Sequence, residues 1–261
     1  MDIRDKQIKE CVYDSDKYII KVQRIIRSSE EDEFLSKMTA NHRGFLMKEI
    51  KRVNIHVNEE NEQFTVFFLE KLKNEIDQIL LNLTVVQFKE IVLQLLLICS
   101  CLNMELDVTH NDINDSNIII QNLKKKNKKY FIMVQTIGKH IFKFQFNEIL
   151  VKLIDFGSMR EHTWLEETDF TAVIGIGDKF VPLIKGNDDE IKMLKQSWNK
   201  FKLKKKNKHF TLDMIKLMQY PMFTEFLYYQ EIPPSCDVDM IKVQYPLKKI
   251  PNWWLQKYPL I

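Results

Sequence analysis

The stretches VTHNDINDSNIII (Val108–Ile120) and VKLIDFGSM (Val151–Met159) decide the fold of this chain of 261 residues. In the first, His110, Asp112 and Asn117 follow the spacing H-x-D-x-x-x-x-N, and the second contains the tripeptide DFG. Apolar, β-branched residues flank both polar motifs, which predicts that each motif lies beside a strand. Either motif alone fits an ordinary turn or helix cap, but both together in this order indicate one functional site.

The two motifs resemble the catalytic loop and the DFG sequence of the protein-kinase-like superfamily, which implies the transfer of a phosphoryl group to a hydroxyl. The carboxylate of Asp112 is suited to orient that hydroxyl and accept its proton. Asn117 offers a neutral oxygen and Asp155 a carboxylate, which are ligands that Mg²⁺ prefers. Gly157 allows the backbone to turn after Asp155. The resemblance therefore implies that Asp112 and Asn117 are catalytic residues and that Asn117 and Asp155 are metal ligands.

A capped helix, expected just upstream of the first motif, strengthens the resemblance to the protein-kinase-like superfamily. The HND form of the loop, the long insert before DFG and the sequence KLIDFG are similar to divergent Ser/Thr protein kinases of large DNA viruses and to atypical, haspin-like kinases. The resemblance covers residues 105–158 and extends from Lys21 to Leu203. It implies an α+β, two-lobed protein-kinase-like fold with a reduced N-terminal β lobe and a mainly helical C-terminal lobe. It also implies ATP- and Mg²⁺-dependent phosphoryl transfer to serine or threonine of a protein substrate.

The resemblance also assigns roles in the N-terminal part. Lys21, in the strand YIIKV, resembles the lysine that reaches the α- and β-phosphates of ATP and counts among the catalytic residues. Its ion-pair partner is expected on the following helix, where Glu49 in FLMKEIKRV is preferred and Glu33 in EEDEFL is the alternative. The segment FFLEKL resembles the strand and hinge that hold adenine through backbone groups. By this resemblance, the ATP-binding residues are Lys21, Glu49, Asp155, Leu69 in the gatekeeper position, Glu70 and Leu72.

The chain departs from the kinase pattern in its loop and at its start. Asn111 replaces the usual arginine, so pairing with a phosphorylated activation loop is not expected. Asn114 stands where a lysine usually assists the γ-phosphate. No glycine precedes Lys21, since the first of the six glycines is Gly44, and an APE motif is missing. A pseudokinase that scaffolds or regulates, with weak or no catalysis, is therefore the alternative function, and a small-molecule phosphotransferase is a third.

Two features after DFG have less specific interpretations. The G-x-G sequence at Gly175–Gly177 lies in the wrong place for a phosphate loop and is expected in an ordinary loop. Asp188 or Asp189, ahead of IKML, is a candidate for a buried aspartate that braces the catalytic loop. A plain carboxylate at a helix N-terminus fits these two residues as well.

The hydrophobic pattern predicts the elements around these motifs. Strands are expected over residues 17–24, 63–70, 118–121 and 150–154, with a hairpin from 130–135 and 140–146. Helices are expected over residues 41–53, 74–83, 188–202 and 211–229. Thr84 and Gln87 form a capping-box pattern before an apolar run to about Asn103, which predicts a buried helix rather than a membrane span.

The motifs and composition divide the chain into three parts. We expect a reduced N-lobe and hinge over residues 1–72, a kinase-like C-lobe over 73–230 with an insert at 122–149, and an irregular tail rich in proline and aromatic residues over 231–261. The lysine runs KKKNKK and KKKNK are interpreted as solvated turns, with a nucleic-acid or acidic-lipid patch as the alternative.

Composition also bounds the protein class, compartment and partners. A hydrophobic content of 45% excludes a disordered chain, and a net charge of +3 gives no reason to expect a nucleic-acid partner. The polar N-terminus MDIRDKQIKECVYD is no signal peptide, and four cysteines without a CxxC pair indicate reduced, largely buried thiols. We therefore expect a soluble intracellular protein, in the cytoplasm or nucleus of a host cell or in a virion. The expected partners are a protein substrate and a protein that regulates or completes the N-terminal lobe, without nucleic acid or membrane.

Overall fold

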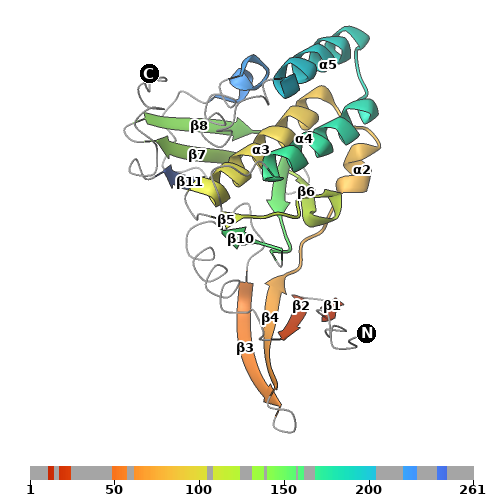
Figure 1. Ribbon diagram of the computed structural model, residues 1–261. Helices are drawn as coiled ribbons and strands as arrows, with labels where there is room; N and C mark the ends of the chain where they lie inside the picture. Colours follow the sequence, from red (N-terminus) through yellow and green to blue (C-terminus); the bar gives the residue numbers. More distant parts are fainter. Residues whose placement is uncertain are drawn as a thin grey trace, which may run out of the picture. The chain divides into compact units, whose positions relative to one another are not determined.

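The computed structural model describes residues 11–14, 18–24, 49–57, 62–104, 108–123, 131–137, 140–156, 158–161, 168–203, 220–227 and 240–245. The chain divides into two compact units, Met1–Lys73 and Asn74–Ile261 (Figure 1). Helices and strands both occur in the described residues, so the predicted α+β class is confirmed.

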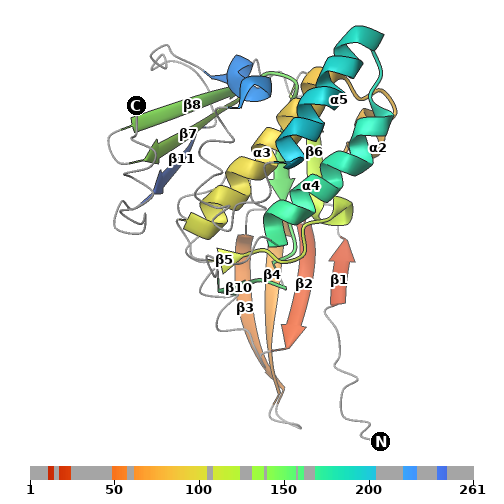
Figure 2. The ribbon, with the colours of Figure 1, turned by 45° about the horizontal axis from the view of Figure 1, so that its top comes forward.

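The described part of the first unit is a four-stranded antiparallel sheet with the order β1-β2-β4-β3 (Figure 2). Its central strands are β2 (Tyr18–Arg24) and β4 (Glu62–Glu70), which confirms both strand predictions in this unit. Their β-branched and aromatic residues favour an extended backbone. The outer strands are β1 (Cys11–Asp14) and β3 (Glu49–Val57).

The helix predicted over residues 41–53 is wrong where the structure describes it. Residues 49–53 belong to strand β3, which pairs with β4 so that Glu49 lies opposite Leu69. In the segment VNIHV, at the end of β3, apolar and polar residues alternate with the period of two that favours a strand. The predicted helix ended at Val53, the first residue of this alternating segment, and so did not take the alternation into account. Residues 41–48 lie outside the described part of the chain.

Helix α3 (Val85–Met104) forms the core of the second unit. It begins at the predicted capping box, in which Thr84 N donates to Gln87 Oε1 and Gln87 N donates to Thr84 Oγ1, both at 3.1 Å. The helix packs against α4 (Thr168–Phe180) and β9 (Ile149–Leu153). By length and composition α3 is apolar enough to cross a membrane, but most of its side chains are buried inside this unit, as the sequence predicts.

Small sheets and further helices complete the second unit. Strands β6 and β9 form an antiparallel ladder, β5 pairs with β10, and β7 and β8 form the predicted hairpin. The strands predicted near residues 118–121 and 150–154 and the helix predicted near 188–202 are also confirmed. The bounds are α2 (Ile76–Leu80), β5 (Val108–Thr109), η2 (Asp115–Asn117), β6 (Ile118–Asn122), β7 (Phe131–Ile137), β8 (His140–Phe146), β10 (Arg160–Glu161), η4 (Val181–Leu183) and α5 (Asp188–Leu203).

Two predictions for the C-terminal part are wrong in the residues that the structure describes. Of the helix predicted over 211–229, the structure describes residues 220–227, and these contain the 3₁₀ turn η6 (Pro221–Phe226). Pro221 has no N–H with which to continue an α-helix. The tail predicted to be irregular contains strand β11 (Met240–Tyr245), which pairs in parallel with β7. The segment IKVQY in β11 alternates apolar and polar residues, as a strand does.

The G-x-G sequence predicted as a loop lies instead within α4. Helix α5 approaches so closely that a Cβ on Gly177 would lie 2.2 Å from Trp198 Cζ2, whereas a Cβ on Gly175 would meet open space. Trp198 is buried and packs edge-on against Phe88 at a ring-centroid distance of 5.4 Å. Gly177 is therefore a helix-packing residue, because only glycine leaves room for the indole.

Gly177→Ala and Gly175→Ala form a matched pair of variants in one helix. We expect Gly177→Ala to lower the free energy of unfolding by about 1–3 kcal/mol, because the added methyl group overlaps the indole. Gly175→Ala should raise it by up to about 1 kcal/mol, because alanine is the better helix former and has space. Urea unfolding followed by circular dichroism measures both, and effects of the same sign would contradict the packing described for α4 and α5.

Candidate active site

The loop between β5 and β6 brings His110, Asp112 and Asn117 together, as their spacing predicts. Asn117 Nδ2 donates to both the backbone oxygen and Oδ2 of Asp112, each at 2.9 Å. Asn114 Nδ2 donates to the other carboxylate oxygen, Oδ1, at 2.9 Å. Asp112 itself is exposed while Asn117 is buried. The loop thus presents one carboxylate to solvent and fixes its direction with two amide groups.

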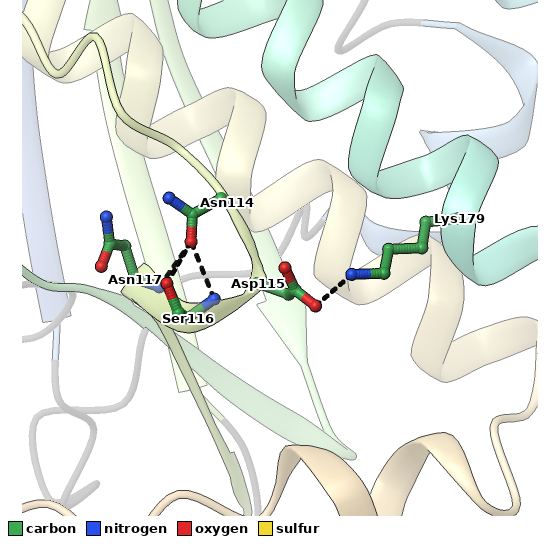
Figure 3. Close-up of polar contacts among 5 residues, drawn as sticks. All are labelled: Asn114, Asp115, Ser116, Asn117 and Lys179. Carbon is green, nitrogen blue, oxygen red and sulfur yellow. Dashed lines mark hydrogen bonds and ion pairs between the residues drawn. The ribbon is translucent and has the colours of Figure 1, made fainter.

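Asn114 shapes the turn that carries Asn117 (Figure 3). Its Oδ1 accepts hydrogen bonds from Ser116 N at 2.9 Å and Asn117 N at 3.3 Å, and also from the Ser116 hydroxyl. These bonds cap the 3₁₀ turn η2, whose first N–H groups have no partner within the turn. Asn114 therefore has a structural role as the cap of this turn.

His110 ties the loop to the segment that contains Asp155. Asp112 N donates to His110 Nδ1 at 3.3 Å, which leaves the ring proton on Nε2, and Nε2 donates to Ile154 O at 3.0 Å. The ring packs edge-on against Phe156 at a centroid distance of 4.9 Å. Burial lowers the pKa of His110 below its ordinary value, against the opposing effect of nearby Asp169. A neutral ring is the form that can make both hydrogen bonds.

The β6–β9 ladder places Asp155 beside the loop. Ile118 of β6 lies opposite Leu153 of β9, and one residue beyond this pair Ile154 N donates to Asn117 O at 3.0 Å. Asn117 and Asp155 therefore lie at the same end of the ladder. Asp155 is exposed and has a φ of 60°, a left-handed conformation that costs an L-residue energy and is enriched at functional sites.

Asp169, in the first turn of α4, holds the backbone of the loop. Its Oδ2 accepts a hydrogen bond from His110 N and its Oδ1 one from Asn111 N, both at 2.9 Å. Asn103 Nδ2, at the end of α3, lies 3.5 Å from Oδ2 of the same carboxylate. Asp169 is buried, so these donors replace the water that an exposed carboxylate would bind.

The sequence interpretation missed Asp169 and considered Asp188 and Asp189 instead. Both are exposed at the start of α5, as the alternative of a plain helix N-terminal carboxylate predicts. Because the G-x-G sequence was interpreted as a loop, no helix was expected over residues 168–180, and Asp169 lies in the first turn of that helix. An aspartate followed by apolar residues at helical spacing indicates the first turn of a helix, but this signal does not show that the carboxylate binds the loop.

Asn111 takes part in a second contact, with the chain that follows the DFG sequence. Its Nδ2 donates to Ser158 O at 3.4 Å, and its own φ is 63°, in the left-handed region that asparagine tolerates better than most residues. Just beyond, Arg160 of β10 pairs with Thr109 of β5. The β5–β10 pairing and the Asn111–Ser158 hydrogen bond therefore hold the segment after Asp155 beside strand β5 and the loop. The side chain at position 111 makes its contact without a charge.

Two polar side chains of α3 hold the backbone of β9, which leads to Asp155. Gln94 Oε1 accepts from Val151 N at 2.9 Å, and its Nε2 donates to Ile149 O at 3.0 Å. One helical turn earlier, buried Glu90 accepts from Asn147 N at 2.8 Å and Ile149 N at 2.9 Å, and also from Glu148 N. Burial, with a smaller contribution from Glu148, raises the pKa of Glu90 to about 7, although the backbone hydrogen bonds act to lower it.

The N-terminal candidates lie in the first unit, and one of them needs a correction. Lys21 is in β2, opposite Phe67 of β4. Glu49 is the first residue of β3, so the helical setting in which it was expected as the partner of Lys21 is wrong. The alternative, Glu33, lies outside the described residues.

The predicted hinge residues lie at the end of the first unit. Leu69 and Glu70 are the last residues of β4 and are partly exposed. Leu72 follows just before the unit boundary at Lys73. This segment therefore connects the four-stranded sheet to the second unit.

The oxygen ligands predicted for Mg²⁺ are Asn117 and Asp155. Among the described residues, no three His, Cys, Asp or Glu side chains gather closely enough to hold a metal ion by themselves. Mg²⁺ is usually bound by one or two carboxylates together with substrate phosphates, and this donor set fits that mode. Asn117 directs its nitrogen toward Asp112, so its oxygen is on the side away from that carboxylate.

Three polar groups lie together near one end of the β6–β9 ladder: the exposed carboxylate of Asp112, the amide of Asn117 and the carboxylate of Asp155. Asp169 binds the backbone at the start of the loop that carries the first two. A scan against models of known protein families finds no match for this chain, and a search of curated proteins finds no similar sequence.

Asp169→Asn tests whether Asp169 is the brace of the loop. The variant replaces one acceptor oxygen with an N–H₂ group that faces a backbone N–H, so we expect a loss of roughly 2–3 kcal/mol in the free energy of unfolding. Asp189→Asn, at the exposed position first considered, is the matched control and should change it by less than about 1 kcal/mol. Equal effects in urea unfolding would contradict the brace.

Glu90→Gln tests the buried carboxylate behind β9. The pKa of Glu90 rises from 4.5 to about 7 on folding, so its contribution to stability is complete below pH 4.5 and is lost as the pH rises through about 7. Relative to Glu90→Gln, the wild type should therefore lose on the order of 2 kcal/mol of unfolding free energy between pH 5 and pH 8. The pKa of His110 is lowered on folding, so its contribution to the unfolding free energy increases with pH. Because His110 is present in both proteins, this contribution cancels in the difference. Urea unfolding across this range checks the difference, and a constant difference would contradict the raised pKa.

Proposed function

We propose that this chain is an ATP- and Mg²⁺-dependent phosphotransferase with a protein-kinase-like, two-lobed fold, which acts on serine or threonine of protein substrates. The observation that carries the proposal is the contact between Asn117 and Asp112, with Asp155 at the same end of the β6–β9 ladder. The division into two compact units at Lys73 supports the two-lobed interpretation.

The roles of the residues follow from what phosphoryl transfer needs. Little covalent chemistry is required of the protein, so catalysis depends on positioning and on stabilising negative charge. Asp112 accepts the proton of the acceptor hydroxyl, and its exposure allows a substrate to reach it. Asn117 and Asp155 hold Mg²⁺, which when bound offsets the charge of the ATP phosphates.

The surrounding contacts reduce the freedom of these groups before substrate arrives. The amides of Asn114 and Asn117 donate to different oxygens of the Asp112 carboxylate, which leaves the side chain little rotational freedom. Neutral His110 links the loop to the backbone beside Asp155. A preorganised site of this kind avoids reorganisation during the reaction.

The N-terminal unit supplies nucleotide binding in this proposal. Lys21, on a central strand of the sheet, contacts the ATP phosphates, and the segment at Leu69, Glu70 and Leu72 holds adenine through its backbone. The pseudokinase alternative is favoured by one observation, that residues 1–20 contain no glycine. Backbone N–H groups of a glycine-rich loop normally bind phosphates, so without them nucleotide binding and transfer are weaker.

Transfer from γ-labelled ATP to a mixture of acidic and basic proteins tests the function. We expect the wild type to label protein only with Mg²⁺ present, and Asp112→Asn to lower kcat by about 10²–10⁴-fold because the proton acceptor is lost. Asp188→Asn, on the exposed start of α5, is the control and should keep wild-type activity. Undiminished transfer by Asp112→Asn would contradict the assignment of the base.

Thermal unfolding with MgATP separates the enzyme from the pseudokinase. A ligand that binds only the native state raises Tm, and at 100 times Kd it adds about 2.7 kcal/mol. We expect a rise for the wild type and for Asp112→Asn, and a smaller one for Asp155→Asn. A rise without phosphate transfer by the wild type would favour the pseudokinase, and no rise at millimolar MgATP would contradict the proposed enzyme.

A further inference from the structure

The last turn of α4 links the candidate catalytic loop to helix α5. Lys179 Nζ donates to Asp115 Oδ2, the first residue of η2 (Figure 3). The preceding residue, Asp178, accepts hydrogen bonds from Trp198 Nε1 at 2.8 Å and from Lys202 Nζ at 2.6 Å. Because Trp198 is buried, the end of α4 that carries Lys179 is firmly placed.

Helix α4 therefore holds the loop at two separate points. Asp169 in its first turn binds the backbone N–H groups of His110 and Asn111. Lys179 in its last turn binds Asp115, and positions 169 and 179 of a helix lie about 15 Å apart along its axis. The first contact fixes the start of the loop and the second fixes the turn at its end.

The negative charge of the loop favours a cationic side chain, such as that of Lys179, beside Asp115. The sequence from His110 to Asn117 contains the acidic residues Asp112 and Asp115 and no lysine or arginine. Lys179 brings a positive charge from α4 and lowers the pKa of Asp115 below its ordinary value through their hydrogen bond. The side chains of the pair are 59% and 44% exposed, so the pair adds little to the total free energy of unfolding. Its effect is on the placement of the turn that contains Asp115.

We propose that Lys179 is a positioning residue of the candidate site: by holding Asp115 it fixes η2, and through η2 it places Asn117 and the carboxylate of Asp112. Few contacts separate Lys179 from the Asp112 carboxylate, because Asn117 ends the turn that Asp115 begins and donates directly to Asp112. This inference rests on the proposed function for its effect on catalysis, but the placement of the turn is measurable in the protein alone.

Hydrogen exchange of the nucleotide-free protein tests the placement. The amides of Ser116 and Asn117, which bind the Asn114 side chain, report on η2. We expect Lys179→Met to increase their exchange rates about threefold, as loss of an exposed ion pair allows. Lys202→Met removes a similar pair, to Asp178, with side chains 30% and 46% exposed, and should leave these two amides unchanged. Equal changes in both variants would overturn the proposal.

Two rescue variants and a kinetic measurement complete the test. Lys179→Arg and the exchanged pair Asp115→Lys with Lys179→Asp should restore slow exchange, because each restores a cation–carboxylate contact. In a transfer assay Lys179→Met should lower kcat severalfold with the KM for ATP unchanged, whereas Lys202→Met should change neither. An exchanged pair that stays as impaired as Lys179→Met would overturn the proposal. If the wild type transfers no phosphate, the proposed function fails, and the exchange rates still decide the role of Lys179.

Discussion

Asp169 buries its carboxylate against the backbone N–H groups of His110 and Asn111, and the candidate site depends on this contact. A buried carboxylate needs several donors to replace water, so the loop cannot move away without a large loss of free energy. Asn111 is held in the left-handed region at the same point. The loop therefore leaves β5 in one direction, toward the turn that carries Asn117.

The other contacts extend this constraint from the loop to the second motif. His110 binds the backbone at Ile154, and the β6–β9 ladder keeps Asn117 and Asp155 at one end of a two-stranded sheet. Behind the ladder, Gln94 and Glu90 of α3 bind the backbone of β9 and of the turn before it. Most of these bonds join a side chain to backbone groups, so the geometry depends on a few polar residues in a largely apolar core.

Local sequence signals predicted much of this structure. The spacing of His110, Asp112 and Asn117 and the capping box at Thr84 both involve residues close in sequence, and the structure places them together as expected. Strands β6 and β9 were evident from continuous apolar runs beside polar turns. These features depend on neighbouring residues, which is the information that one sequence carries directly.

Features that depend on distant contacts were predicted poorly. Glu49 was expected on a helix because the apolar residues before it permit one, but pairing with β4 makes that segment a strand. Gly177 suggested a loop, whereas the indole of Trp198 explains it. Asp169 has no local signature that separates it from any helix N-terminal acid. Its partners lie more than fifty positions earlier in the chain and become visible only in the folded protein.

The central claim is that Asn117 and Asp155 share a metal ion with the phosphates of a bound nucleotide. The most direct test is NMR of the ¹⁵N-labelled protein titrated with ATP and Mn²⁺, a paramagnetic ion that occupies Mg²⁺ sites. The account predicts selective broadening of the Asn117 side-chain amide and the Asp155 backbone amide, while Asn147, beyond the far end of β9, stays sharp. Uniform broadening, or none at these two groups, would contradict it.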